Sequence, residues 1–413
     1  MRLSVFTPSH DTRHLDLAYG SLASQSFEDW EWIVLLNGKA QNWQAPVEDA
    51  RVKVSRAPSR LKGVGALKRA ACELASGEIL VELDHDDYLT RGSLAAIAQA
   101  FSSPDVVVAY SDWAQINSDG SPNFDLFDLS YGWTYTRGAI DGTELNRCHA
   151  MEASPHNVGY VWYAPNHVRA FRRTTYEKVG GYDADRPFLD DHDLLCRLYI
   201  EGDFHHIKRC CYLQRIHAHN TQAEKKTNAA IQEETVVIYR HYIEDMALAW
   251  AARRGLATIR LRTPVWMGDD PDERYDDVTV DPDEPSLELD ESSVGVVKTY
   301  DVLCRVGAHT RLFNEVYRVM PHAGVWLTKT PSTDGRGAFQ DPGYRAFYNE
   351  NSFMYFTQDA LRPVMPDYTA RFQISHLRTF YPSPGHEELG IAYVEANLLP
   401  VKDGPRQGGP LLC

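Results

Sequence analysis

The sequence lacks the features that mark several specialised classes of protein. Its seven cysteines are an odd number and never take a CxxC spacing, so neither a disulfide framework nor a zinc site is predicted. Reduced cysteines fit the cytoplasm, which is the expected compartment. No apolar run approaches the ~20 residues that span a bilayer, and no signal-peptide pattern is present. The net charge of −15 argues against broad binding to nucleic acid or to anionic membranes.

What the sequence does contain is typical of a soluble α/β protein with two domains. At 413 residues, with 43% hydrophobic and 24% charged residues, it exceeds the size of one ordinary core. Composition changes near residue 264, and 12 of the 23 residues from Asp269 to Glu291 are acidic. The predicted division is a first domain over residues 1–222, a helical connector over 223–262, a second domain over 263–400 and a disordered tail over 401–413.

Residues 1–110 alternate between strand patterns and helix patterns, which predicts a largely parallel sheet. An alanine-rich helix is expected to end at Gly77, because glycine is a good C-cap residue. The predicted strands are Leu3–Phe6, 32–36, Val52–Ser55, Ile79–Leu83 and Val106–Tyr110, and the predicted helices are His14–Ser24, Gly63–Ser76 and Leu94–Phe101.

Residues 111–170 lose this regularity and are rich in tryptophan, tyrosine, asparagine, histidine and glycine. Such a stretch forms either a substrate-facing surface or an irregular part of the core. Aromatic rings in it could stack on a sugar acceptor, with ordinary core packing as the alternative: Trp133, Tyr135, His156 and Trp162. Regular patterns then return as helices at Asp191–Ile200, Ala223–Arg254 and His309–Val319 and strands at Val294–Tyr300 and Val325–Lys329.

The strand pattern at residues 79–83 leads directly into Asp84, Asp86 and Asp87. Carboxylates this close repel each other strongly when they are desolvated without a partner. A divalent cation such as Mg²⁺ or Mn²⁺ is a suitable partner because hard cations prefer oxygen ligands. The tip of such a strand is also where an open α/β sheet binds phosphorylated ligands. The alternative is an acidic loop that only keeps the strand end soluble.

The order of features over residues 1–225 resembles glycosyltransferase family 2, whose members are inverting enzymes with the GT-A fold, an α/β Rossmann-like fold. One such segment would be weak evidence, whereas several in the family's order over half the chain are fairly specific. The segments that carry the resemblance are Val5–Ser9, Gly63–Ala70, Leu83–Asp87, Tyr110–Asp112 with Asp119-Gly120, Gly180–Asp183 with Asp190–Leu194, and Arg215–Thr221.

The resemblance implies a metal-dependent transferase that moves a sugar from a nucleotide-diphospho-sugar to the hydroxyl of a glycan, protein or small-molecule acceptor. A UDP-sugar or dTDP-sugar is the expected donor. The family often has an aspartate after its second strand, where Asn37 stands here. An amide can also bond the edge of uracil, because it both donates and accepts hydrogen bonds.

Donor-side roles follow from the same resemblance. Asp86 and His217 are expected to ligate Mn²⁺ or Mg²⁺, and Asp84 to orient the ribose or a metal-bound water. His219 would share a face with His217 on an extended segment. Asp87 could support this site or contact the sugar, with a helix or turn cap as the alternative.

Asp191 occupies the position of the family's general base, which would take the proton of the acceptor hydroxyl. Its alternative role is local, because acidic residues favour a helix N-terminus. The remaining residues are expected to contact the nucleotide and its phosphates: Thr7, Pro8, Asn37, Lys68 and Arg215. The alternative for Lys68 and Arg215 is that they are surface cations.

Residues 264–356 resemble a class I SAM-dependent methyltransferase, a second and smaller Rossmann-like α/β domain. In that family a glycine-rich turn lets the backbone approach the cofactor, and here only Gly268 remains of it, followed by Asp269 and Asp270. Side chains at these positions would crowd the cofactor and add charge beside its carboxylate. We therefore expect a degenerate domain without SAM that serves acceptor docking or oligomerisation, which leaves a homodimer open. If SAM does bind, Asp281 is the expected ribose contact. The matching segments are 278–281, 294–297, 300–303 and 314–320.

Three functions are compatible with these patterns. The leading one is an inverting glycosyltransferase fused to a methyltransferase-like domain. The alternative is a bifunctional enzyme that glycosylates and methylates one glycan or natural product, and the incomplete glycine turn argues against it. A sugar-nucleotide-binding scaffold without turnover is the third, and the carboxylates at Asp86 and Asp191 argue against it.

Overall fold

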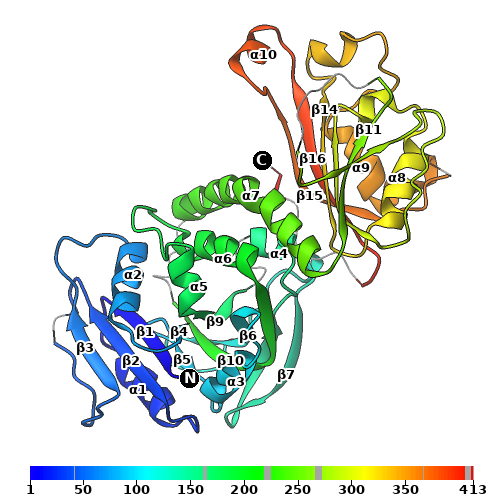
Figure 1. Cartoon of the computed structure of the whole chain (residues 1–413). Coiled ribbons are helices and arrows are strands. Elements are labelled where there is room, and N and C mark those ends of the chain that lie inside the picture. Colours follow the sequence, from blue (N-terminus) through cyan, green and yellow to red (C-terminus); the bar gives the residue numbers. More distant parts are fainter. Residues whose placement is uncertain are drawn as a thin grey trace. The chain divides into compact units, whose positions relative to one another are not determined.

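The structure is a computed structural model that describes residues 1–40, 42–160, 165–217, 225–265, 272–365, 367–404 and 411–412. The chain forms two compact units, Met1–Tyr242 and Ile243–Cys413. The division falls within helix α7 (Lys225–Arg253), a continuous helix where one or two were predicted. Figure 1 shows the elements of both units, which are described separately below.

Unit 1 is built on one ten-stranded sheet with the order β3-β2-β1-β4-β9-β6-β10-β5, to which β7 and β8 are joined through β6. Most strands are continuous buried runs, as expected for a sheet covered on both faces. The bounds are β1 Leu3–Ser9, β2 Trp30–Leu36, β3 Val52–Arg56, β4 Ile79–Glu82, β5 Tyr88–Leu89, β6 Val106–Asn117, β7 Thr134–Ile140, β8 Thr143–His149, β9 His167–Arg172 and β10 Asp203–Ile216.

The strands predicted within residues 1–110 all run in one direction, as expected, but the whole sheet is mixed. Strands β3, β2, β1 and β4 are parallel, but β9 lies between β4 and β6 and is antiparallel to both. Strand β9 was not predicted because its sequence is short and interrupted by Arg169. Since β6 and β10 run parallel to β4, the carboxyl ends of six strands lie at one edge, where α/β sheets bind ligands.

The helices of unit 1 largely follow the predicted segments. Helix α2 ends at Leu74, so Gly77 is not its C-cap. Glycine is needed there for another reason, because a Cβ atom would lie 2.7 Å from the carbonyl oxygen of Arg2. The helix bounds are α1 Leu15–Ala23, α2 Val64–Leu74, α3 Ser93–Ala100, α4 Pro155–Gly159, α5 Arg173–Lys178 and α6 Asp190–Glu201.

The stretch predicted to be irregular contains the end of β6 and the β7–β8 hairpin. Asp141 and Gly142 form its turn with φ angles of 50° and 89°, as in two-residue hairpin turns. This Asp-Gly pair is the sequence signal that would have revealed the hairpin. Trp133 and His156 are buried, Tyr135 is half-buried with its hydroxyl accepting the backbone N–H of Phe127, and Trp162 lies outside the described residues.

Unit 2 contains a seven-stranded sheet with the order β12-β11-β13-β14-β16-β15-β17. The first four strands are parallel, whereas β16 is antiparallel to its neighbours. The predicted strand Val294–Tyr300 and helix His309–Val319 are confirmed with those bounds. The strands are β11 Ala257–Arg262, β12 Asp276–Thr279, β13 Val294–Tyr300, β14 Val325–Pro331, β15 Phe372–Phe380, β16 Tyr393–Pro400 and β17 Leu411–Leu412, and the helices are α8 His309–Val319, α9 Glu350–Thr357 and α10 Pro384–Glu388.

Some of the predicted features lie outside the described residues: Gly268, Asp269, Asp270, His219 and most of the predicted tail. The six cysteines of the described part are all free and buried. Among the described helices, none combines the length and the hydropathy needed to cross a bilayer.

Candidate functional site

The acidic turn after β4 is fixed by the end of β10. Asp87 is buried, and its Oδ1 accepts the backbone N–H of Arg215 at 2.6 Å. Burial raises the pKa of Asp87 well above its ordinary value, and the neighbouring carboxylate of Asp86 adds to the shift. The Asp87 side chain therefore ties the acidic turn to strand β10.

Arg215 connects the acidic turn to a third element. Its side chain is buried, its Nε donates to the carbonyl oxygen of Asp86 at 2.9 Å, and its Nη1 donates to those of Asn117 and Ser118 at 3.2 and 3.1 Å. These bonds tie together the carboxyl ends of β4, β6 and β10. In this structure the guanidinium acts on backbone carbonyls, whereas the sequence predicted a phosphate contact for it.

Asp86 and His217 are brought together at this edge although they are 131 residues apart in the chain. Asp86 Oδ2 lies 2.7 Å from His217 Nε2, and their side chains keep 14% and 24% of their surface exposed. Carboxylate oxygen and imidazole nitrogen are both donors that Mn²⁺ accepts. The pair therefore fits two ligands of one cation with an open side.

The described residues contain no cluster of three or more histidine, cysteine, aspartate or glutamate side chains arranged to hold a metal ion. Two protein ligands agree with the usual pattern for Mg²⁺ bound with nucleotides, in which one or two carboxylates and the substrate phosphates complete the shell. His219, the other predicted candidate, is outside the described residues.

Asp84 lies on the sheet side of the same turn. Its backbone N–H donates to the hydroxyl oxygen of Tyr212 at 3.1 Å. Burial raises the pKa of Asp84 to about 6, and the negative charge of Glu82 adds to the shift. A partly exposed carboxyl with a raised pKa, next to Asp86, gains from a cation or a hydroxyl donor placed beside it.

Lys68 is not at a phosphate-facing position. Its Nζ lies 2.7 Å from Glu82 Oε1 and 3.4 Å from Asp190 Oδ2, and all three side chains are more than nine-tenths buried. Burial alone would lower the pKa of Lys68, but the carboxylates of Asp190 and Glu82 outweigh it and hold the pKa above its ordinary value. The alternative predicted for Lys68, a surface cation, is wrong, because it neutralises buried carboxylates.

Helix α2 reaches this position because Gly65 lets it pack closely. A Cβ atom at Gly65 would lie 2.3 Å from the carbonyl oxygen of Asp183 and 3.0 Å from Asp190 Cβ. The glycine therefore sets the approach of α2 to the start of α6 and, with it, the pairing of Lys68 with Asp190.

Asp191 is the most accessible member of this ionic network, with 27% of its side-chain surface exposed. Its Oδ2 is paired with Nη1 of Arg169, and its Oδ1 accepts the backbone N–H of His192 at 2.8 Å. Burial would raise the pKa of Asp191, but Arg169 and then Lys68 outweigh it and lower the pKa below its ordinary range. Asp191 is thus ionised at neutral pH.

Arg169 is the residue that sequence reasoning missed. It lies on β9, and its Nη2 donates to Glu82 Oε1 at 3.2 Å while Nη1 pairs with Asp191. Glu82 also accepts the hydroxyl of Tyr182 at 3.0 Å. One guanidinium therefore links the strand that carries the acidic turn to the helix that carries Asp191. The available signal was an arginine between the apolar residues Val168 and Ala170 of a short strand.

The three remaining predicted contact residues, Thr7, Pro8 and Asn37, lie at the carboxyl ends of β1 and β2. The hydroxyl of Thr7 is buried, donates to the carbonyl oxygen of Leu83 at 2.8 Å and accepts Trp32 Nε1–H at 2.8 Å. Pro8, the next residue of β1, is partly exposed. Asn37 is also partly exposed, and its backbone N–H donates to the carbonyl oxygen of Ser9 at 2.8 Å. Thr7 therefore supports the edge from inside, and the Asn37 side chain stands at the edge itself.

Comparison with known sequences assigns part of unit 1. Residues 4–157 match the family described as "Glycosyl transferase family 2". Among curated proteins, the chain is 22% identical over 230 residues to a hyaluronan synthase of Pasteurella multocida and 20% identical over 229 residues to a chondroitin synthase of Escherichia coli. Each match covers 54% of this chain but only 21% and 30% of the relative, so the chain spans less than a third of their length.

Solved structures give weaker likenesses over a similar part of the chain. S. aureus TarS 1–349 in complex with UDP-GlcNAc matches at 13% identity with a TM-score of 0.42, over 62% of this chain and 72% of that one. Mannosyltransferase PcManGT from Pyrobaculum calidifontis, in complex with GDP-Man and Mn²⁺, matches at a TM-score of 0.38 over 62% and 76%. The sequence matches, rather than these structural ones, show that unit 1 contains a glycosyltransferase family 2 domain and support a glycosyltransferase enzyme.

Proposed function

We propose that the chain is a metal-dependent inverting glycosyltransferase of the GT-A type that takes a nucleotide-diphospho-sugar as donor. The observation that carries the proposal is the Asp86–His217 pair, 2.7 Å apart at the carboxyl edge of the sheet that contains the family 2 domain. Asp191 is linked to the same edge through Arg169 and Glu82. The acceptor-side carboxylate is therefore tied to β4, the strand that carries the acidic turn.

On the donor side, Asp86 and His217 would hold Mn²⁺ or Mg²⁺. When bound, the cation neutralises the charge of the diphosphate leaving group. Asp84 would orient the ribose, and Asn37 would contact the base. A UDP-sugar or dTDP-sugar is the donor we propose, because an amide satisfies the edge of uracil or thymine as both donor and acceptor.

On the acceptor side, Asp191 takes the proton of the acceptor hydroxyl. The freed oxygen attacks the anomeric carbon while the bond from that carbon to the diphosphate oxygen breaks, which inverts the configuration. A carboxylate must be ionised to accept a proton, and the ion pair with Arg169 keeps Asp191 in that state. Arg169 acts as a positioning residue for the carboxylate.

The donor side is tested by release of nucleoside diphosphate from a panel of UDP-, dTDP- and GDP-sugars with and without Mn²⁺. We expect turnover that requires the cation and falls at least about 100-fold in Asp86→Asn, since a lost charge-stabilising contact costs at least that much. Asp105→Asn, an exposed aspartate at the opposite end of β6, is the matched control and should retain full activity. Equal turnover in the two variants would contradict the proposal.

For unit 2 we propose a methyltransferase-like domain that no longer methylates. The strand order reverses between β11 and β13, and such a switch point is where α/β sheets bind ligands, which favours a ligand-binding ancestry. Calorimetry with SAM separates this proposal from a bifunctional enzyme. We expect no binding in the micromolar range, and micromolar binding would favour the bifunctional alternative instead.

A further inference from the structure

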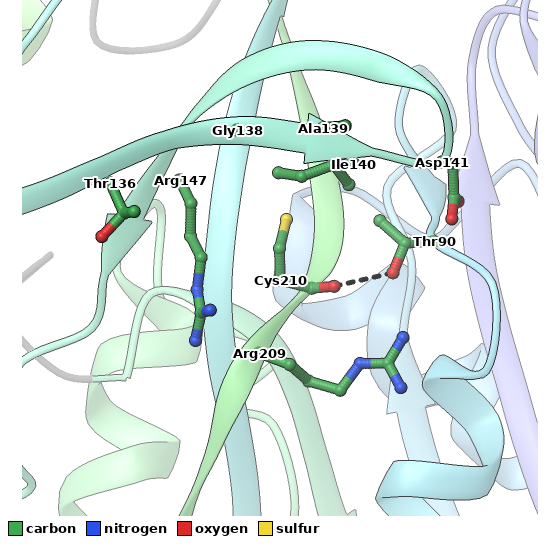
Figure 2. A pocket seen from close by; sticks show the side chains of 9 residues that line it. All are labelled: Thr90, Thr136, Gly138, Ala139, Ile140, Asp141, Arg147, Arg209 and Cys210. Atoms are coloured by element: carbon green, nitrogen blue, oxygen red, sulfur yellow. Dashed lines mark hydrogen bonds between the residues drawn. The ribbon is translucent and has the colours of Figure 1, made fainter.

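A cavity of about 330 Å³ lies in unit 1 between the β7–β8 hairpin and strand β10 (Figure 2). Its volume is within the range of small-ligand sites. Cys210 is in its floor, and Thr90, which also lines it, follows Asp87 of the acidic turn by three residues. None of the lining residues is one proposed for the donor site, so the cavity is adjacent to that site but distinct from it.

The hairpin over this cavity is held at both ends. At its tip, Asp141 Oδ2 accepts the backbone N–H of Arg91 at 2.8 Å. At its base, β8 pairs with β6 through Cys148 and Arg147. Leu145 packs into a small buried apolar cluster with residues of β6 and β10. Because it is anchored at both ends, the hairpin forms a defined roof.

Two arginines line the cavity, Arg147 from β8 and Arg209 from β10 (Figure 2). Part of each guanidinium group is held by hydrogen bonds to another residue. Arg147 Nε donates to the buried Asp112 carboxylate at 2.7 Å, and Arg209 Nη2 donates to the carbonyl oxygen of Arg91 at 2.6 Å. Within the described part of the chain, Nη1 of Arg147 and of Arg209 have no hydrogen-bond partner. A guanidinium fixed in this way presents its other donors in a geometry that matches a carboxylate or a phosphate.

The rest of the lining is suited to hydroxyl groups. Thr136 Oγ1 lies 2.5 Å from His149 Nε2, so this exposed hydroxyl is oriented, whereas Thr90 is buried and its hydroxyl donates to the carbonyl oxygen of Cys210 at 2.7 Å. Asp141 adds a carboxylate beside Thr90 at the tip of the hairpin (Figure 2). Acceptors and donors for hydroxyl groups thus accompany the two cations.

We propose that this cavity binds an acidic sugar unit, one whose ring carries a carboxylate or a phosphate. The acid group would contact Arg147 and Arg209, and the ring hydroxyls would contact Asp141 and Thr136. A purely anionic ligand would not need the Asp141 carboxylate, and a neutral sugar would not need two guanidinium groups. That this unit belongs to the glycan acceptor rests on the proposed function, whereas its binding does not.

The proposal is tested by calorimetric titration of the full chain with glucuronate, glucose 6-phosphate, glucose and inorganic phosphate. At least one of the two acidic sugars should bind at least about 10-fold more tightly than both glucose and inorganic phosphate, since a charge-assisted hydrogen bond contributes about that factor. Which of them binds distinguishes a carboxylate from a phosphate source. Equal affinity for glucose, inorganic phosphate binding as tightly as the sugars, or no binding in the millimolar range would each overturn the proposal.

Variants locate the binding. Arg209→Gln should weaken it at least about 10-fold, because Arg209 is exposed and the change removes its charge with little effect on folding. Gly138→Trp, which puts a large side chain on the face of β7 that it shares with Ile140 and Thr136, should abolish it. Arg137→Gln, an exposed arginine on the same hairpin that pairs with Glu144, is the matched control and should bind as the wild type does.

Asp86→Asn separates this site from the donor site, because it should lose donor turnover and keep acidic-sugar binding. If Asp86→Asn lost the sugar, or if Arg209→Gln and Arg137→Gln bound it equally, the cavity would not be the binding site. Failure of donor turnover with sugar binding intact would count against the proposed function alone.

Discussion

Replacing Arg169 with methionine is expected to lower the free energy of unfolding by about 3–5 kcal/mol, the cost of removing one partner from a buried ion pair. Arg169 pairs with Glu82, which is 3% exposed, and with Asp191. Without it, Lys68 alone would face the charges of Glu82, Asp190 and Asp191. Equilibrium unfolding in urea measures the loss.

Two further variants show whether charge is the cause. Arg137→Met removes an exposed arginine whose partner Glu144 is also exposed, and it should barely change the free energy of unfolding. Adding Glu82→Gln to Arg169→Met removes one uncompensated charge, so the double variant should be more stable than Arg169→Met alone. A loss in Arg169→Met no larger than in Arg137→Met would show that the network does not stabilise the fold.

Asp191→Asn is expected to reduce kcat by about 10²–10⁴-fold, the usual contribution of a general base. The amide keeps the shape of the side chain and can still accept the backbone N–H of His192, so the start of α6 should be preserved. Affinity for the nucleoside diphosphate should stay as in the wild type, because the residue acts on the acceptor. Transfer rates and nucleotide affinity, measured on the same preparation, check both statements.

The pH dependence of the wild type supplies a second check on Asp191. The pKa of Asp191 is lowered in the folded protein, so its carboxylate is ionised even at pH values where an ordinary aspartate is partly protonated, and it stays ionised through neutral pH. Protonation of Asp191 should therefore reduce kcat only on the strongly acidic side.

Retention of more than a tenth of the wild-type kcat in Asp191→Asn would exclude Asp191 as the base.

Those parts of the fold that depend on local sequence were predictable. Strand Val294–Tyr300 is rich in valine, and helix His309–Val319 has one apolar face, and each is found at its predicted bounds. Strand β9 was not, because its place between β4 and β6 depends on pairing with residues far away in the chain. The Asp141-Gly142 hairpin carried a local signal that went unused.

The candidate site shows the same division. The resemblance to glycosyltransferase family 2 predicted that Asp86 and His217 act together, and the structure places them 2.7 Å apart. It also placed Lys68 at the phosphates, whereas the structure pairs it with Glu82. A sequence shows that charged residues are present but not which of them will be buried together. Arg169 was missed for the same reason.

Anomalous diffraction from a crystal soaked with UDP and Mn²⁺ tests the seat of the cation most directly. We expect one manganese peak bonded to the Asp86 carboxylate, the His217 imidazole and oxygens of the diphosphate. A nucleotide bound at the sheet edge with no manganese between these two side chains, or a peak at another set of carboxylates, would contradict it.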